Sequence, residues 1–190
     1  MKTEYLKIIP KLGSLDDSDL ELNRTLFKFK IFKKGNCIVK PGTNTQNIYF
    51  LVSGLVYSHS IEEKINWYEF EGHSFADIES VFFNKRCEQY IRCAENSSVV
   101  SISKGNLMEL VKANHNWSVW YALFLEEIIQ RLYSYYQSLL VKDASQRYNE
   151  LVELHPEILQ RIPLGHIASY LGITQVSLSR IRGGKQRKKH

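Results

Sequence analysis

The sequence has no long apolar run and no leader-like start, and both absences exclude classes of protein. No stretch approaches the roughly 18–20 consecutive apolar residues that are needed to span a bilayer. The first residues, Met1–Tyr5, carry one lysine with no apolar segment behind it, unlike a signal peptide. We therefore expect a cytoplasmic protein that does not bind a membrane.

Metal-binding and catalytic motifs are also missing. The chain has three cysteines, and no two of them have the two-residue spacing of a metal-binding knuckle. The histidines are scattered without an HExxH pair, and neither a glycine-rich phosphate loop nor a GxSxG motif occurs. We expect the chain not to be an enzyme and to hold neither a metal nor a cofactor.

The composition that is present is typical of a globular protein with a local excess of positive charge. The 190 residues are 44% hydrophobic, enough for one large domain or two small ones. The formal net charge is +5, and residues 180–190 hold six basic residues and no acidic one, so the rest of the chain is close to neutral. Such a cluster attracts polyanions. A solvated tail that only aids solubility is the alternative.

Apolar residues alternate with polar ones from Phe27 to about Ser103. Within this stretch, residues 48–52 (IYFLV) have the composition of a strand that is buried on both faces. Turn signals such as Pro41-Gly42 interrupt the pattern at short intervals. Many short strands at this spacing predict an antiparallel sandwich or barrel.

The longest helical pattern runs from Asn116 to Val141 and carries two apolar seams. The first seam is Tyr121, Phe124, Ile128 and Tyr135, and the second is Leu125, Ile129, Leu132, Tyr136 and Leu139. A helix that packs on one side needs a single stripe, so two stripes predict two partners. One partner is the chain's own barrel, and the other is most simply the same helix of a second chain. A helix that is buried on both sides within a monomer is the alternative.

The pattern restarts after this helix. Asp143 with Gln146 three places on forms a capping box, and His155-Pro156 ends the helix that follows. We place a domain boundary here, between the long helix and an all-helical tail of about fifty residues.

Two further helices joined by a tight turn are predicted between Pro163 and Gly183. The first buries Ile167, Ala168 and Leu171, and Gly172 supplies the left-handed residue of the turn.

The second of these helices begins after Thr174, which caps it, and turns Leu178 and Ile181 inward. We expect it to end at Gly183-Gly184. Small Ala168 lets the two helices approach closely, so the pair has the pattern of a helix-turn-helix.

The outer face of the second helix has side chains that suit the major groove of DNA. Arginine pairs with guanine, glutamine pairs with adenine, and an apolar group contacts the thymine methyl. The predicted base-reading residues are Gln175, Val176, Ser179 and Arg180. The predicted contacts to the DNA backbone are Thr174, Ser177, Arg182, Lys185, Arg187, Lys188 and Lys189.

The order of these parts resembles the Crp/Fnr family of bacterial transcription regulators over nearly the whole chain. The strongest similarity lies in 167–174 (IASYLGIT) and 178–182 (LSRIR), and 48–56 (IYFLVSGLV) is similar to the family's sheet signature.

The resemblance implies an α+β fold. An N-terminal antiparallel β-roll of the double-stranded β-helix or jelly-roll type, with flanking helices, precedes a long dimerisation helix and a C-terminal all-α helix-turn-helix domain. The implied domains are a cyclic-nucleotide-binding-like sensor over 1–115, the dimerisation helix over 116–142, and the DNA-binding domain with its basic tail over 143–190.

The resemblance also implies a function. Members of the family are homodimers that place one recognition helix on each half-site of a near-palindrome. We therefore expect a sequence-specific transcription regulator that binds double-stranded DNA as a homodimer. RNA polymerase and an unidentified small-molecule effector are further candidate partners.

The expected ligand site departs from the family's pattern. Cyclic-nucleotide binders have a cassette that opens with glycine, continues to Gly-Glu and ends in Arg-Ser-Ala or Arg-Thr-Ala. The candidate effector pocket that corresponds to this cassette here is Gly72, Ala76, Asp77, Arg86, Cys87, Glu88 and Gln89.

In this cassette Cys87 occupies the place of the phosphate-binding arginine, and Glu88 adds an anion nearby. Arg86 is one residue away from that place and on the opposite face of an extended chain. Loss of the arginine removes a charge-assisted contact to phosphate. We therefore expect that cyclic AMP is not the effector, and that Cys87 is an inert thiol.

The carboxyl end also differs, since the eight residues after Arg182 are too few for the two-stranded wing that many members have. The alternative function is a small-molecule-sensing β-roll whose helical tail docks a protein partner. Arginines and lysines without neighbouring acids favour DNA over that alternative.

Overall fold

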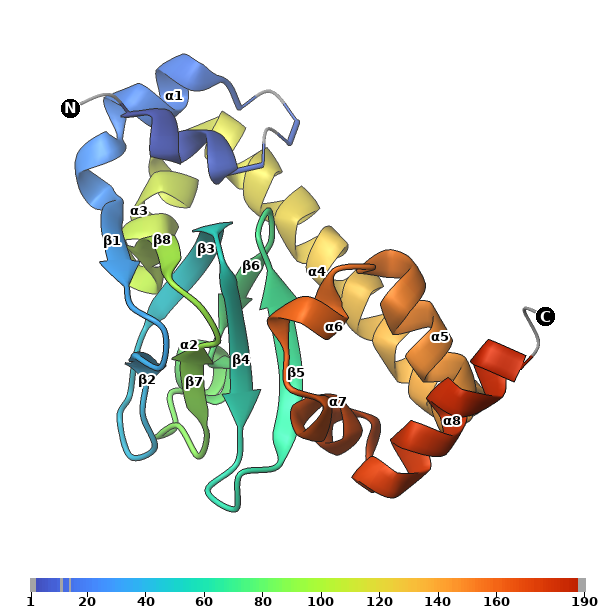
Figure 1. Ribbon diagram of the computed structural model, residues 1–190. Coiled ribbons are helices and arrows are strands. Elements are labelled where there is room, and N and C mark those ends of the chain that lie inside the picture. The colour runs from blue at the N-terminus through green and yellow to red at the C-terminus, as the bar shows by residue number, and fades with distance from the viewer. Residues whose placement is uncertain (1–2, 11, 14, 188–190) are drawn as a thin grey trace.

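The structure, a computed structural model, describes residues 3–10, 12–13 and 15–187. Short helices come first, a β-roll of two sheets follows, and a long helix leads into a helical tail (Figure 1). The N-terminal helices are η1 (Thr3–Ile8), α1 (Asp17–Leu22) and η2 (Arg24–Leu26). The strands are β1 (Lys28–Phe32), β2 (Cys37–Val39), β3 (Asn47–Ser53), β4 (Leu55–His59), β5 (Ile65–Phe70), β6 (Ser74–Ala76), β7 (Tyr90–Cys93) and β8 (Ser97–Ser103), with α2 (Ile78–Phe83) between β6 and β7. The remaining helices are α3 (Lys104–Ala113), α4 (His115–Val141), α5 (Ala144–Leu154), α6 (Ile158–Arg161), α7 (Leu164–Leu171) and α8 (Gln175–Arg187).

The two sheets of the roll are antiparallel throughout. Their strand orders are β1-β8-β3-β6 and β2-β7-β4-β5. The turn from β3 to β4 depends on Gly54, whose φ of 99° suits glycine and whose added Cβ would lie 2.7 Å from the Asn96 carbonyl oxygen. The predicted antiparallel roll is therefore confirmed.

Strand β3 is buried on both faces, as its apolar sequence predicts. Ile48 and Phe50 point into the core between this sheet and the helices, which we call the helical core. Tyr49 and Leu51 point between the two sheets, into what we call the roll interior. Alternate residues of one strand thus belong to two different cores.

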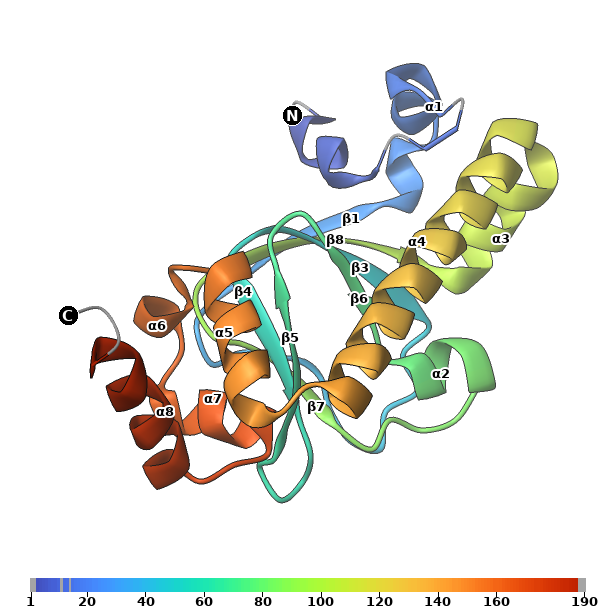
Figure 2. The ribbon, with the colours of Figure 1, turned by 90° about the vertical axis from the view of Figure 1, so that its right-hand side faces the viewer.

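The first seam of α4 packs into the helical core only in part. Tyr121 and Ile128 lie against that core, whereas Tyr135 is 39% exposed and contacts Tyr170 of the tail instead. Phe124 is buried, and Trp117 and Trp120 of the same helix are buried with it. The Trp120 ring stacks on Phe124 at 4.7 Å, and its Nε1 donates to the Pro10 carbonyl at 2.6 Å. The first half of α4 is thereby fixed to α3 and the N-terminal helices (Figure 2).

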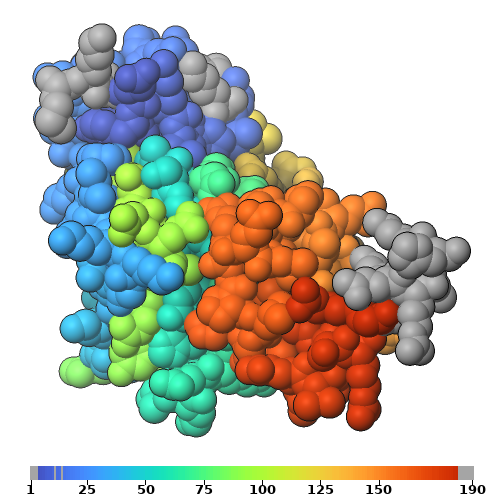
Figure 3. All heavy atoms as spheres, in the orientation of Figure 1, coloured from blue at the N-terminus to red at the C-terminus, as the bar shows by residue number. Residues whose placement is uncertain are grey.

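The tail packs on the outer face of the second sheet. Leu55 of β4 and Phe70 of β5 share a core with Ile158, Ile162 and residues of α7, which we call the tail core. Figure 3 shows the orange and red atoms of the tail directly against the teal atoms of the roll. The tail is therefore joined to the rest of the chain by packing as well as by α4.

The start of α5 is as predicted, but the end of α8 is not. Asp143 and Gln146 form a capping box, with each side chain bonded to the other's backbone N–H at 2.8 and 2.9 Å. The expected helix end at Gly183-Gly184 is wrong, since α8 continues to Arg187. Glycine ends a helix by taking a left-handed backbone, as Gly172 does at a φ of 69°, whereas Gly183 stays helical and good helix formers follow it.

Candidate nucleic-acid interface and effector pocket

Helices α7 and α8 form the predicted pair. Gly172 ends α7 in the left-handed conformation, and Thr174 Oγ1 then accepts from the Ser177 backbone N–H at 3.1 Å, which caps α8. Ala168 and Leu178 are buried in the tail core, so the inward face of each helix is the predicted one. Close packing at Ala168 fixes α8 rigidly on α7.

The outward face of α8 carries the predicted base-reading residues. Gln175, Val176, Ser179 and Arg180 are all exposed, and Val176 keeps 61% of its surface accessible even though it is apolar. The Gln175 amide bends back over α7, because a Cβ added to Gly165 would lie only 2.4 Å from its Nε2. Val176, Ser179 and Arg180 therefore face solvent, while Gln175 must change rotamer to join them.

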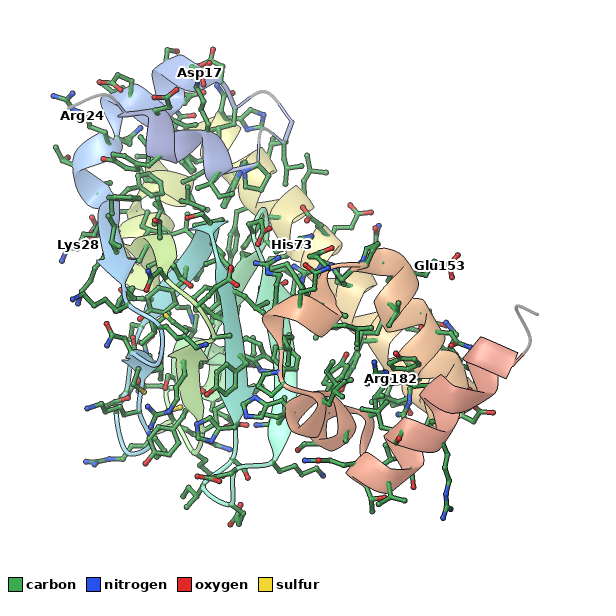
Figure 4. The ribbon with its side chains drawn as sticks, viewed as in Figure 1. Asp17, Arg24, Lys28, His73, Glu153 and Arg182 are labelled. Carbon is green, nitrogen blue, oxygen red and sulfur yellow. The ribbon has the colours of Figure 1, made fainter. Side chains whose placement is uncertain are left out.

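The residues that we predicted to contact the DNA backbone differ from one another in their surroundings. The hydroxyls of Thr174 and Ser177 are 3.0 Å apart, and Arg182 is half-buried on the side of α8 that faces α5 (Figure 4). Lys185 and Arg187 belong to α8, but their side chains are outside the described part of the structure, as are Lys188 and Lys189 altogether.

Acidic residues are absent from the end of the chain. Glu157 is the last acid in the sequence, so neither α7 nor α8 has one. Arg180 and Arg182 form no ion pair among the described residues. An exposed helix with unneutralised cations is suited to a polyanion.

The second seam of α4 is largely exposed. Ile129, Leu132, Tyr136 and Leu139 have between 42% and 64% of their surfaces accessible, and Leu125 is half-buried. Leu140 and Val141 continue the apolar surface to the end of the helix. A monomer rarely exposes so much contiguous apolar surface on one helix.

Three members of the predicted effector pocket come together inside the roll. Asp77 is fully buried, and its carboxylate accepts from the Cys87 thiol at 3.0 Å and from Gln89 Nε2 at 3.1 Å. Burial alone would raise the pKa of Asp77, but the hydrogen bonds from Cys87, Ser80 and Gln89 outweigh burial and hold it below its ordinary value. Where cyclic-nucleotide binders of the family have an arginine for the phosphate, this chain thus has a buried carboxylate, which already accepts hydrogen bonds from neighbouring side chains.

The sequence did not indicate the other side of this network. The Gln89 amide oxygen accepts from Ser58 Oγ and, at 3.1 Å, from Asn66 Nδ2. Ser58 and Asn66 come from β4 and β5, and only the pairing of these strands brings them to Gln89.

The remaining predicted pocket residues do not join the network. Gly72 lies in the β5–β6 turn, and Ala76 ends β6. Arg86 and Glu88 are exposed, and Arg86 Nη1 donates to the Gly42 carbonyl at 3.3 Å. Only three of the seven cassette residues, Asp77, Cys87 and Gln89, therefore meet at one site.

Aromatic rings fill the roll interior beside this network. Tyr49 stacks on Phe75 at 5.0 Å, and Trp67 lies 6.2 Å from the same ring. The space between the sheets is consequently occupied by the chain's own side chains.

The Cys87 thiol has the environment of a structural cysteine. Burial raises its pKa to about 12, and the hydrogen bond to Asp77 adds to the rise. A raised pKa disfavours the thiolate, which is the reactive form of cysteine.

Sequence reasoning missed the residues that hold the tail on the roll. The Arg161 guanidinium donates to Glu71 and Glu95 at 2.8 Å each and to the Gly54 carbonyl at 3.0 Å. Glu157 lies 3.4 Å from the same guanidinium, and we call these four side chains the Arg161 clamp. Arg161 and Glu71 are 90 residues apart in sequence, so no local pattern could have indicated the contact.

His155 forms a second contact between tail and roll. Its ring stacks on Phe70 of β5 with centroids 3.6 Å apart and planes 4° apart. Burial lowers the pKa of His155 below its ordinary value, so the ring is neutral near pH 7.

The described part of the chain contains neither a candidate membrane-spanning helix nor a candidate metal-binding cluster. None of its helices is long and apolar enough to cross a membrane. Nor do its His, Cys, Asp and Glu side chains gather in a group of three or more that could hold a metal ion.

The roll, the long helix and the helical tail together define the fold of Crp/Fnr regulators, with its cyclic-nucleotide-binding-like roll, and the resemblance drawn from the sequence is confirmed at the level of the fold. Solved structures that share it include the catabolite activator protein of Thermus thermophilus, with 14% identity, a TM-score of 0.53 and coverage of 93% of this chain and 86% of that one.

Two others are similar over comparable lengths. A CooA variant from Carboxydothermus hydrogenoformans has 16% identity and a TM-score of 0.65 over 93% of this chain and 87% of that one. FixK2 from Bradyrhizobium japonicum has 14% identity and a TM-score of 0.68 over 86% of each. No protein-family model and no curated protein matches the sequence.

Proposed function

We propose that the chain is a sequence-specific DNA-binding transcription regulator that reads a near-palindromic site as a homodimer. The observation that carries the proposal is the outward face of α8, where Arg180 and Val176 are exposed with no acid on the helix. Arginine recognises guanine through two hydrogen bonds, and valine suits a thymine methyl. The similar solved structures include the sensor domain of a transcriptional regulator, DNR, which agrees with this function.

The homodimer is supported by α4. Apart from Tyr135, its first seam packs on the chain's own core, whereas its second seam is largely exposed. Pairing the second seam with that of another copy would bury this apolar surface and relate two α8 helices by a two-fold axis.

We assign to the end of the chain the part of the DNA affinity that does not come from contacts with bases. Thr174, Ser177, Arg182 and the cations after Gly184 are proposed to contact phosphates, which adds affinity without sequence information. RNA polymerase remains a candidate partner for a DNA-bound dimer. A regulator of this kind acts in the cytoplasm, and we propose no catalytic activity for it.

Cyclic AMP is not proposed as the effector. A cyclic phosphate in the cassette would meet the buried Asp77 carboxylate instead of an arginine. Two anions in a buried site repel each other, and no cation there would compensate them. Any effector must therefore bind elsewhere or have a different chemistry.

The proposal is tested by selecting sites from a pool of random duplexes with the purified protein, without an effector, at near-physiological salt. Enrichment of a two-fold-symmetric site is the expected result. Recovery of unenriched DNA would instead favour the protein-docking alternative, in which the tail binds DNA only non-specifically.

A further inference from the structure

A cavity of about 310 Å³ lies where the roll, α4 and the tail meet. Its walls come from β5, α4, α5 and α7. It is separate from the Asp77 network, since neither Asp77 nor Cys87 lines it. Any molecule bound there would contact the sensor roll, the long helix and the tail at once.

The acids in the cavity wall already have partners. Glu69 accepts two hydrogen bonds from Arg131 Nη2, at 2.7 and 2.8 Å. Glu150 is bonded to Lys142 Nζ at 2.6 Å and to Ser138 Oγ at 3.0 Å. Neither carboxylate needs a further cation.

Arg147 differs from these pairs. Its Nη2 donates to the Leu171 carbonyl at 2.8 Å, but no carboxylate among the described residues lies within ion-pairing distance. Its Nε is buried and has no hydrogen-bond partner there. Arg147 as a whole is half-buried, and an anion that accepted from its buried Nε would satisfy this donor and neutralise the charge.

The Tyr68 hydroxyl is also buried in this wall without a partner among the described residues. The Tyr68 ring meets Tyr170 edge-on at 5.7 Å, and Tyr170 stacks with Tyr135 at 6.4 Å. We call these three rings the tyrosine wall. Arg147 lines the same cavity as these three rings.

We propose that this cavity binds a small aromatic carboxylate, with Arg147 as its counter-ion, the Tyr68 hydroxyl as a second donor and the tyrosine wall against its ring. The cavity has the size of small ligand sites, which begin at about 300 Å³. His73 and His155 also line it, but burial lowers the pKa of both, so they are neutral near pH 7. Among the described residues that line the cavity, Arg147 is the cation without a carboxylate partner. A ligand with one negative charge therefore fits better than a ligand with two.

Binding is tested on the full-length protein by calorimetric titration with three probes: phenylacetate, its neutral analogue 2-phenylethanol, and acetate. Phenylacetate is expected to bind at least about ten-fold more tightly than either of the others, because only it supplies both the anion and the ring. No detectable binding of phenylacetate at about 10 mM would overturn the proposal, and so would equal affinity for phenylacetate and 2-phenylethanol.

Variants then locate the site. Arg147→Gln is expected to weaken phenylacetate binding about ten-fold or more, and Arg147→Lys to recover part of the loss. Arg24→Gln in η2 removes a guanidinium that does not line the cavity, and it should not change the affinity. Unchanged affinity in Arg147→Gln would overturn the assignment.

Tyr68→Phe provides a second variant, because it removes only a hydroxyl that has no partner and so should leave folding intact. We expect a several-fold loss of affinity with the ring retained, and unchanged affinity would remove Tyr68 from the site. These results do not depend on DNA binding, so the cavity and the proposed regulatory function can fail separately.

Discussion

Arg180 is exposed on α8 and has no acid nearby on the same helix. An arginine in this position is free to approach base edges, whereas Arg182, two residues on, is half-buried toward α5. Residues of the same type on one helix therefore have different surroundings, which depend on the direction that each side chain takes from the helix.

Replacing Arg180 with alanine should weaken binding at the preferred site by about 1–3 kcal/mol and relax specificity at one base pair, because one bidentate base contact is lost. Fluorescence anisotropy on the selected site and on single-base variants measures both effects. Arg24→Ala, in the N-terminal helix η2, is the control. An equal loss on every sequence would show that Arg180 contacts only phosphates.

At the scale of the element, α4 has one surface that is buried in the chain's own core and another that is exposed. Trp117, Trp120 and Phe124 hold its first half against the helical core, while Ile129 and Leu132 remain exposed further along. The change occurs within one uninterrupted helix, so the exposed seam is held rigidly by the buried one.

Ile129→Glu should convert the protein to a monomer and weaken binding to the selected site by at least about ten-fold, because a charge would be buried in the dimer seam. Ile129 is 64% exposed in the single chain, so its fold should be unaffected. Sedimentation and anisotropy give the two readouts. Leu22→Glu, on α1 and 80% exposed, is the matched control, and a dimeric Ile129→Glu protein would contradict the proposed seam.

Elements with strong local patterns could be predicted from the sequence. The double burial of β3, the Asp143 cap and the Gly172 turn each depend on residues within a few positions of one another, and each prediction is confirmed. The end of α8 could not be predicted in this way, because a glycine stops a helix only when its backbone becomes left-handed.

The long-range contacts at the sites could not be predicted from the sequence. Ser58 and Asn66 reach Gln89 only because β4 pairs with both β5 and β7. Arg161 likewise meets Glu71 and Glu95 through the docking of the tail. Such contacts leave no periodic signal, since they depend on how separately formed elements pack.

At the scale of the whole molecule, the Arg161 clamp is the main polar link between tail and roll. Arg161→Ala should lower the free energy of unfolding by about 2–3 kcal/mol, because Glu71 and Glu95 lose charged hydrogen bonds in a partly buried site. Arg161→Lys should recover part of that loss. Urea denaturation measures it, and Arg24→Ala, which breaks a surface pair with Glu21, should cost no more than about 1 kcal/mol.

The His155–Phe70 stack makes tail docking sensitive to pH. Burial holds the pKa of His155 below the usual value of about 6.5, so the unfolded chain binds the proton more readily. Stability from this group is full above pH 6.5 and declines as the pH falls below it. His155→Phe keeps the stack but removes the titration, so its unfolding free energy should decline less between pH 7 and 5. Parallel declines for both proteins would exclude His155 as the cause.

The two neighbouring residues Leu55 and Val56 of β4 belong to different cores, the first to the tail core and the second to the roll interior. A slip of one position in the pairing of β4 would exchange their faces. A single inserted residue at the start of this strand would therefore disturb the packing of the tail on the roll, although it would alter no residue of α7 or α8. The register of β4 therefore determines how the tail packs on the roll.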